Sequence, residues 1–276
     1  MLRKLLGMAA VLACLAGGCS EHRQEGDPRM DDASLAKDLA LIAEHRIFFG
    51  HQSVGVDIMQ GIRDLKSAHG IAALRIVSLD RDSVPQGPYF AEALVGRNSE
   101  PDSKCDMFQS VVGTLAADSL EIALMKFCYV DIKKHTDVNE MFRYYESVLE
   151  ELERTHPGIT FVHVTVPVTE RNVWWRRFVK KLLGREEEWD IASVKSSEFN
   201  GMLQKRFAGQ PIFDLAAVES TYPDGSRSMF EADGMTAYTM VSAYTRDGGH
   251  LNEQGRRLAA RELVKTLAAV IRKRSS

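Results

Sequence analysis

The sequence predicts an α/β domain in which a parallel sheet has helices on both faces. Short apolar runs rich in β-branched or aromatic residues alternate with longer amphipathic segments between residues 35 and 272, and this alternation is typical of parallel sheets. No internal repeat, low-complexity block or linker divides the stretch. In such sheets the functional site lies beyond the carboxyl ends of the strands, so the residues that follow each predicted strand are the first candidates.

The first half of the domain is predicted to begin with a helix over 35–45, in which Leu35, Leu39 and Ile42 recur at helical spacing. An apolar run then predicts a strand over 46–49 that leads into Gly50. The other elements expected here are a helix over 54–69, a strand over 74–77, a helix over 106–117 and a strand over 122–127.

In the second half, a strongly periodic segment predicts a helix over 138–155, which Pro157 and Gly158 end. The β-branched run 160–166 (TFVHVTV) stops at Pro167 and is typical of a buried strand. A helix over 193–207, a strand over 211–214 and a helix over 252–273 complete the predicted domain.

Composition excludes several classes of protein. The 276 residues are 45% hydrophobic and 26% charged, which is ordinary for a globular chain, and the net charge of −3 shows no basic excess for nucleic acid. Cysteines at 14, 19, 105 and 128 form neither a C-x-x-C pair nor a zinc spacing. Cys128, at an apolar strand end, is typical of a buried small hydrophobic residue, although a disulfide with Cys105 stays open.

The amino terminus has the features of a bacterial export signal. Residues 1–18 combine a short basic head with an apolar run that is far shorter than the roughly 20 residues of a membrane-spanning helix. The segment Ala16-Gly17-Gly18-Cys19 resembles a lipobox, in which the cysteine is acylated; an ordinary cleaved signal is the alternative. Ser20 after the cysteine favours the outer membrane. We therefore expect a lipoprotein signal peptide over 1–18, lipidation of Cys19, a flexible tether over 19–34 and one domain over 35–276, on the periplasmic side of the outer membrane.

One candidate motif is FFGHQSVG, residues 48–55. It predicts a strand that runs through Gly50 to a serine, Ser53, at the start of a helix. A hydroxyl in that position can act as a nucleophile beside the free backbone N–H groups of the helix. The alternative is that Ser53 only caps the helix.

The second motif is DGGHLN, residues 247–252, which comes before the last predicted helix. A carboxylate three residues before a histidine can turn back to orient its ring, so Asp247 could leave one nitrogen of His250 free as a base. Alternatively, both side chains only cap the final helix.

Together the two motifs resemble the SGNH/GDSL hydrolase superfamily, and in particular a bacterial subgroup with FFGHQSVG and DGGHLN sequences. The resemblance implies a flavodoxin-like three-layer α/β/α sandwich in which Ser53 is the nucleophile, His250 the general base and acid, and Asp247 its orienting partner. Two departures stand out. Gly50-His51-Gln52-Ser53 replaces the usual Gly-Asp-Ser, and Val130 occupies the place of an asparagine that normally donates to the oxyanion.

A substitute oxyanion donor is therefore expected, because losing one such donor costs about a hundred- to a thousandfold in rate. The resemblance assigns the oxyanion hole to the N–H groups of Ser53 and Gly96 and the side-chain amide of Asn98, with Gln52 as a further donor. A plain turn residue is the alternative for Asn98. Asp131 is expected to steady the site through backbone hydrogen bonds.

No cofactor and no metal are predicted. His51 lies close to Ser53 in the sequence, but His51, Asp247 and His250 lack the close, repeated spacing of structural metal ligands. The predicted activity is that of a serine esterase acting on acetyl or short acyl esters, on envelope carbohydrate or another small ester. The alternatives are an O-acyltransferase with the same triad and a non-catalytic binding lipoprotein. The expected partners are the ester substrate and, through the lipid, a membrane; no nucleic acid is expected.

A basic segment over 174–185 (WWRRFVKKLLGR) has its apolar residues at helical spacing and its basic residues on the other face. Interfacial membrane binding requires this pattern. A helix packed on its own domain and a lid beside the active site are the alternatives.

Overall fold

The protein is built on a six-stranded sheet in which every pair of neighbouring strands is parallel. The computed structural model describes residues 32–275 except 85, 118, 172–187 and 233. The sheet has the order β2-β3-β1-β4-β5-β6. Its strands are β1 (Arg46–His51), β2 (Ile76–Ser78), β3 (Tyr89–Leu94), β4 (Ile122–Met125), β5 (Thr160–Val164) and β6 (Ile212–Phe213).

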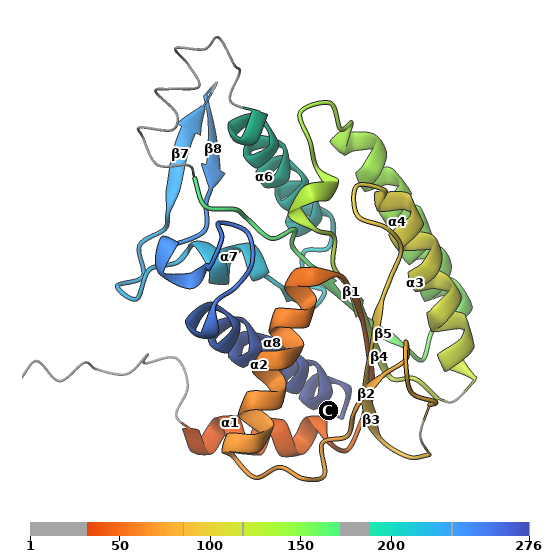
Figure 1. The fold of residues 1–276 in the computed structure, drawn as a ribbon. Coiled ribbons are helices and arrows are strands. Elements are labelled where there is room, and N and C mark those ends of the chain that lie inside the picture. Colours follow the sequence, from red (N-terminus) through yellow and green to blue (C-terminus); the bar gives the residue numbers. More distant parts are fainter. Residues whose placement is uncertain (1–31, 85, 118, 172–187, 233, 276) are drawn as a thin grey trace, which may run out of the picture. The chain divides into compact units, whose positions relative to one another are not determined.

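Two layers of helices cover the sheet, as Figure 1 shows. On one face lie α1 (Asp32–Ile42), α2 (Ser53–Ala68) and the last helix, α8 (Glu253–Arg274), which packs against both. On the other face lie α3 (Pro101–Ala116), α4 (Val138–Thr155) and α6 (Glu188–Arg206). The prediction of a three-layer α/β/α sandwich around a parallel sheet is therefore confirmed.

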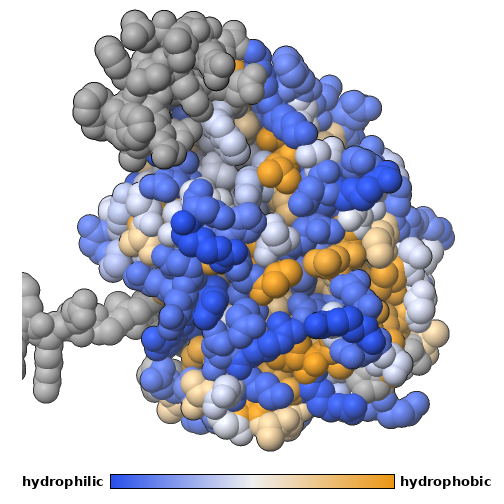
Figure 2. All heavy atoms as spheres, in the orientation of Figure 1, coloured by the Kyte–Doolittle hydropathy of each residue, from blue (hydrophilic) through white to orange (hydrophobic). Residues whose placement is uncertain are grey.

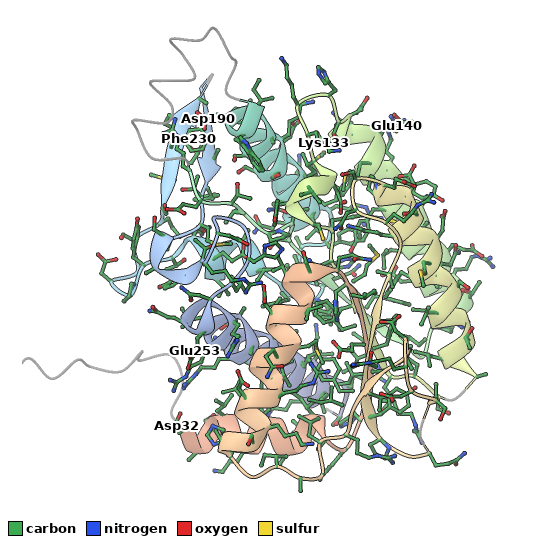
Figure 3. The ribbon with its side chains drawn as sticks, in the orientation of Figure 1. Asp32, Lys133, Glu140, Asp190, Phe230 and Glu253 are labelled. Carbon is green, nitrogen blue, oxygen red and sulfur yellow. The ribbon has the colours of Figure 1, made fainter. Side chains whose placement is uncertain are left out.

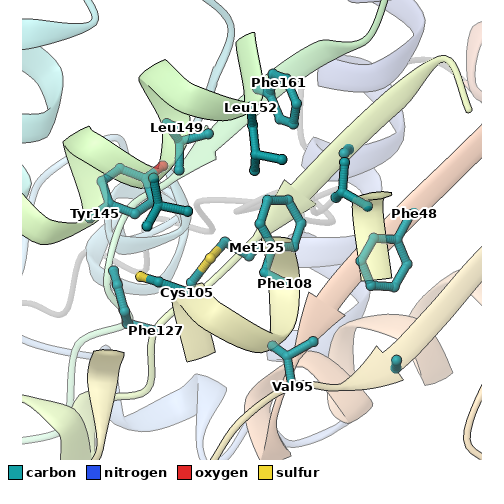
Figure 4. Close-up of a cluster of buried hydrophobic side chains, with 14 of the residues drawn as sticks. Phe48, Val95, Cys105, Phe108, Met125, Phe127, Tyr145, Leu149, Leu152 and Phe161 are labelled. Carbon is teal, nitrogen blue, oxygen red and sulfur yellow. The ribbon is translucent and has the colours of Figure 1, made fainter. Parts of the chain in front are cut away.

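Alternation of side chains along β1 gives each helical layer its own core. Phe48 is fully buried and stacks on Phe108 of α3, with ring centroids 5.8 Å apart. Its neighbours Ile47 and Phe49 are equally buried, and they point to the opposite face because successive strand residues alternate. Figure 4 shows the cluster on the α3 side, in which aromatic rings interleave with aliphatic and sulfur-containing side chains. This packing holds the carboxyl ends of β1, β3 and β4 together.

A small antiparallel hairpin is attached beside α6. It consists of β7 (Met229–Ala232) and β8 (Met235–Tyr238), and it packs on α6 through Val194. Arg171 lies over the ring of Phe230 at 3.9 Å and pairs with Asp190 at 3.0 Å. Figure 3 shows Phe230 and Asp190, the two partners of Arg171, side by side. The face in Figure 2 is mostly hydrophilic, with hydrophobic side chains in scattered patches.

Several elements differ from the sequence-based prediction. The strand β3 was not predicted, because the buried Glu92 interrupts its apolar pattern. The helix α3 begins at Pro101 rather than 106, and α6 at Glu188 rather than 193. The short helix α7 (Leu215–Ser220) and the β7–β8 hairpin were also missed. By contrast, α4 has the predicted bounds, because its strong periodicity and the Pro-Gly stop are local signals.

The predicted signal peptide over 1–18, the lipidated Cys19 and the basic segment 174–185 lie outside the described residues. Helix α1 begins at Asp32, so residues 32–34 of the predicted tether are helical. None of the described helices combines the length and the apolar character that crossing a bilayer requires.

Candidate active site

The candidate site residues follow three strands that are neighbours in the sheet. Ser53 comes after β1, Asn98 after β3, and a short 3-10 helix, η1 (Tyr129–Asp131), after β4. Because β3, β1 and β4 are adjacent and parallel, their carboxyl ends meet at one edge. The sheet topology therefore agrees with the sequence-based expectation that the site lies at this edge.

Ser53 is the first residue of α2 and is half-buried. The N-cap position belongs to Gln52, so the alternative of Ser53 as the cap is wrong. Gln52 does not cap the helix either, because its side-chain nitrogen donates to the carbonyl oxygens of Val95 at 3.0 Å and Gly96 at 2.9 Å. Both amide hydrogens of Gln52 are used in this way, which corrects its assignment as a further oxyanion donor. The Ser53 hydroxyl thus lies at the positive end of the helix dipole.

His51 is buried behind this turn and is held on both sides of its ring. Its Nε2 lies 2.9 Å from Glu92 Oε2, and its Nδ1 lies 3.1 Å from the carbonyl oxygen of Gln52. Arg63 of α2 also pairs with Glu92. Burial alone would raise the pKa of Glu92, but the bonds from His51 and Arg63 outweigh burial and lower it. His51 is therefore part of the support of the β1–α2 turn. In the described part of the chain, no three His, Cys, Asp or Glu side chains are grouped closely enough to hold a metal ion.

His250 and Asp247 form a close pair in the loop before α8. The Nδ1 atom of His250 lies 2.7 Å from Asp247 Oδ2, and Asp247 Oδ1 accepts the backbone N–H groups of Gly249 and His250 at 3.0 and 2.8 Å. Partial burial would raise the pKa of Asp247, but these backbone bonds and the His250 ring outweigh it and lower the pKa to about 2. The carboxylate stays ionised at neutral pH and holds Nδ1, which leaves Nε2 as the ring nitrogen available for proton transfer.

Asp57 joins the two motifs and was missed in the sequence. It lies in α2, one helical turn after Ser53, and its side chain is mostly buried. Its Oδ1 accepts from Arg246 at 2.9 Å, and its Oδ2 accepts the backbone N–H of Leu251 at 3.1 Å. Arg246 and Leu251 flank the Asp247–His250 pair. The helix that begins with Ser53 is thus tied to the loop that carries His250. An acidic residue at the fourth position after a candidate nucleophile was the available signal.

Tyr129 brings the end of β4 to the same loop. Its ring meets the His250 ring edge-on, with centroids 5.9 Å apart. A side chain at position 249 would not fit, because a Cβ there would lie 2.6 Å from the Tyr129 ring. Gly249 therefore permits the close approach of Tyr129 and His250. Partial burial and then the charge of Asp247 raise the pKa of the Tyr129 hydroxyl, so it remains protonated at neutral pH.

The loop after β3 places the predicted oxyanion donors differently. The backbone N–H of Gly96 donates to the sulfur of Met107 at 3.2 Å, so Gly96 is not positioned as a free donor, contrary to prediction. The side chain of Asn98 is exposed and accepts a bond from Lys104 at its Oδ1. Asp131 accepts backbone N–H groups of Ser99 at 2.8 Å and Cys128 at 2.7 Å. The expectation that Asp131 steadies the site through backbone hydrogen bonds is confirmed.

A small hollow of about 10 Å³, room for about one water molecule, lies beside Tyr129. It lies between the chain that leaves β5 and the first turns of α6, with Tyr238 of the hairpin at its edge. Its lining mixes aromatic rings with the hydroxyls of Thr169 and Ser193. Ser53, His250 and Asn98 are not among the residues that line it.

Cys105 and Cys128 are both buried and both free thiols. The open question of a disulfide between them is thus decided against it. Burial raises the pKa of the Cys105 thiol, so it is protonated at neutral pH and unreactive.

Fold and site together define an α/β sandwich with a serine at the head of its second helix and a histidine–aspartate pair before its last helix. No protein-family model matches the chain, and no curated protein matches it. Solved structures do match.

One similar structure is a carbohydrate esterase family 3 protein from Talaromyces cellulolyticus, at 12% identity, with 83% of this chain and 97% of that chain covered and a TM-score of 0.45. Another is an acetyl esterase mutant with acetate ion, at 13% identity, with 83% and 97% covered and a TM-score of 0.46. A third is a member of the lipolytic protein G-D-S-L family from Veillonella parvula, at 13% identity, with 80% and 96% covered and a TM-score of 0.42. A further one is described as an SGNH hydrolase from Slackia heliotrinireducens, at 15% identity, with 81% and 98% covered and a TM-score of 0.45.

Proposed function

We propose that the protein is a serine esterase of the SGNH/GDSL type that removes acetyl or other short acyl groups. The observation that carries the proposal is the hydrogen bond of 2.7 Å between His250 Nδ1 and Asp247 Oδ2, in a loop that Asp57 ties to the helix begun by Ser53. Nucleophilic acyl transfer needs an imidazole that is oriented to take the proton of a serine hydroxyl, and the tie through Asp57 supports this arrangement.

In the proposed reaction, Ser53 Oγ attacks the ester carbonyl carbon while His250 Nε2 takes the hydroxyl proton. The tetrahedral oxyanion accepts hydrogen bonds from the backbone N–H of Ser53 and the side-chain amide of Asn98. His250 then gives its proton to the departing alkoxide, which leaves as an alcohol. Water repeats the two steps on the acyl-enzyme, so a carboxylic acid is released and Ser53 and His250 are restored.

The choice of acetyl or short acyl esters is supported by the superfamily that the FFGHQSVG and DGGHLN motifs resemble, together with the expected location in the cell envelope. We also propose that a lipid anchor at Cys19 holds the domain on the periplasmic side of the outer membrane. Acylated envelope carbohydrate is the proposed substrate there. The lipobox-like sequence Ala16-Gly17-Gly18-Cys19 supports this location.

The proposal is tested by hydrolysis of 4-nitrophenyl esters of increasing chain length and of acetylated glycans, with Ser53→Ala as the control. We expect turnover of acetate and short acyl esters, a steep loss with longer chains, and none with Ser53→Ala. A wild-type protein that is folded but inactive on all of them contradicts the proposal. Acyl transfer to a glycan hydroxyl that outpaces hydrolysis would make the protein a transferase instead.

A further inference from the structure

Lys104 is a lysine with no exposed surface, in the first turns of α3 behind the loop that carries Asn98. Lysine is almost never fully buried unless its charge is paired. The Lys104 ammonium is 2.5 Å from Asp131 Oδ2 and 3.1 Å from Asn98 Oδ1. A buried ion pair therefore holds a side chain that we have placed in the oxyanion hole.

Asp131 connects this ion pair to two strand ends. Its side chain is also fully buried. Its Oδ1 accepts the N–H of Ser99, after β3, while its Oδ2 accepts the N–H of Cys128, after β4. The loop that bears Asn98 is thus fixed on one side by Asp131, and on the other side by the bond from Gln52 to the Gly96 carbonyl.

The backbone of this loop is bent tightly around the start of α3. Gly96 has a φ of +59°, and a Cβ there would lie 2.5 Å from the Lys104 backbone nitrogen. Ser99 also adopts a positive φ, 68°, although it is not a glycine. A non-glycine residue keeps such a conformation only where its surroundings hold it, and the Ser99 N–H bond to Asp131 does so.

The contact with Lys104 decides which way the Asn98 amide faces. An ammonium group has three donors and no acceptor, so only the amide oxygen of Asn98 can face it. The NH₂ group is then directed away from α3. Within the described residues, the Asn98 NH₂ group has no hydrogen-bond partner, and the side chain is exposed at the same sheet edge as Ser53.

We propose that Lys104, paired with Asp131, is a positioning residue that turns the Asn98 NH₂ toward the oxyanion formed at Ser53. The inference rests on the proposed function. It explains how the site can work with Val130 at the position where the superfamily resemblance implies an asparagine: a donor from the loop after β3 is held by a buried cation. Lys104 itself touches neither substrate nor nucleophile.

The test is a double-mutant cycle on 4-nitrophenyl acetate hydrolysis with Asn98→Ala and Lys104→Met. We expect each single variant to lower kcat by about a hundred- to a thousandfold, with KM little changed, because an oxyanion donor acts in the transition state. The double variant should be no slower than Asn98→Ala, since Lys104 acts through Asn98.

Lys126→Met is the matched control. Lys126 is also fully buried, and it bonds to the carbonyl of Phe127 and to Cys128 Sγ rather than to Asn98. We expect Lys126→Met to lower kcat by the same factor in the wild type and in Asn98→Ala. If Lys104→Met also lowers kcat by the same factor in both backgrounds, Lys104 does not act through Asn98 and the positioning role is overturned.

Lys104→Met leaves the buried Asp131 without its cation and could therefore unfold the protein. Asn98→Asp is a second variant that leaves this ion pair in place. Aspartate keeps the bond to Lys104 but has no NH₂, and we expect kcat to fall at least as far as in Asn98→Ala. An unchanged kcat in Asn98→Asp overturns the inference even if the wild type is an active esterase. No turnover by the folded wild type overturns the proposed function, and this role with it.

Discussion

The two sides of the candidate site are built in different ways. On the His250 side the bonds are local: Asp247 holds a ring three residues away, and the side chains are partly exposed. On the Asn98 side the bonds are long-range, with Lys104 and Ser99 reaching Asp131 across 27 and 32 residues, and the ion pair is fully buried. The base is therefore oriented by a short turn, while the oxyanion side depends on the packed core.

The largest effect is expected on the His250 side, in activity alone. Asp247→Asn should lower kcat by about ten-thousandfold, because an amide no longer stabilises the required tautomer and the imidazolium. Its unfolding free energy should change by less than about 1 kcal/mol, since the pair is at the surface. Steady-state kinetics and urea denaturation measure both. A loss below tenfold would show that Asp247 does not orient the base.

On the Asn98 side we expect a large effect on stability as well. Asp131→Ala removes the partner of the buried Lys104 and two acceptors of backbone N–H groups. We expect it to lower the unfolding free energy by about 3–5 kcal/mol, because an uncompensated buried charge remains. Urea denaturation measures the loss. A change as small as that of Asp247→Asn would remove the distinction between the two sides.

A change between the two motifs should have an intermediate effect. Asp57→Asn weakens the bonds from α2 to Arg246 and Leu251, so the His250 loop is held less firmly relative to Ser53. We expect kcat to fall by about ten- to a hundredfold, because a shift of about 1 Å in a catalytic group costs that much. The conservative Asp57→Glu is the control for charge. Full activity in Asp57→Asn would show that the position of the His250 loop does not depend on Asp57.

These differences explain what could be predicted from the sequence. Ser53, His250 and Asp247 could be predicted because they belong to short motifs with a fixed spacing of chemically reactive residues. Lys104 lies among polar neighbours ahead of the helix predicted over 106–117, and only the folded chain brings it to Asn98 and Asp131. Gln52 and Gly96 were assigned as donors from the superfamily resemblance, which places a loop near the site but does not show which way each N–H points. The strand β3 was missed for a related reason, since the partners of buried Glu92 come from β1 and α2.

The smallest effect concerns a second histidine, His163, which is buried where His250 is partly exposed. His163 in β5 is fully buried; its Nδ1 lies 2.8 Å from the Tyr145 hydroxyl and its Nε2 lies 2.9 Å from Gln210 Oε1. Burial lowers its pKa from 6.5 to about 4. Between those values the unfolded chain binds a proton that the folded chain does not, so stability must fall as the pH falls.

Between pH 6.5 and 5.5 this contribution to the unfolding free energy should decrease by about 1 kcal/mol. The measurement is urea denaturation of the wild type and His163→Asn at both pH values. The difference in stability between the two proteins should shrink by that amount at the lower pH. A difference that stays constant would mean that His163 does not titrate as described.

The most direct test of an activated Ser53 is labelling of the purified protein with a fluorophosphonate, with the modified peptide mapped by mass spectrometry. We expect an adduct on Ser53 in the wild type and its loss in His250→Ala. An adduct on another residue, or no adduct on a folded wild-type protein, would contradict the triad and favour a binding protein with the same fold.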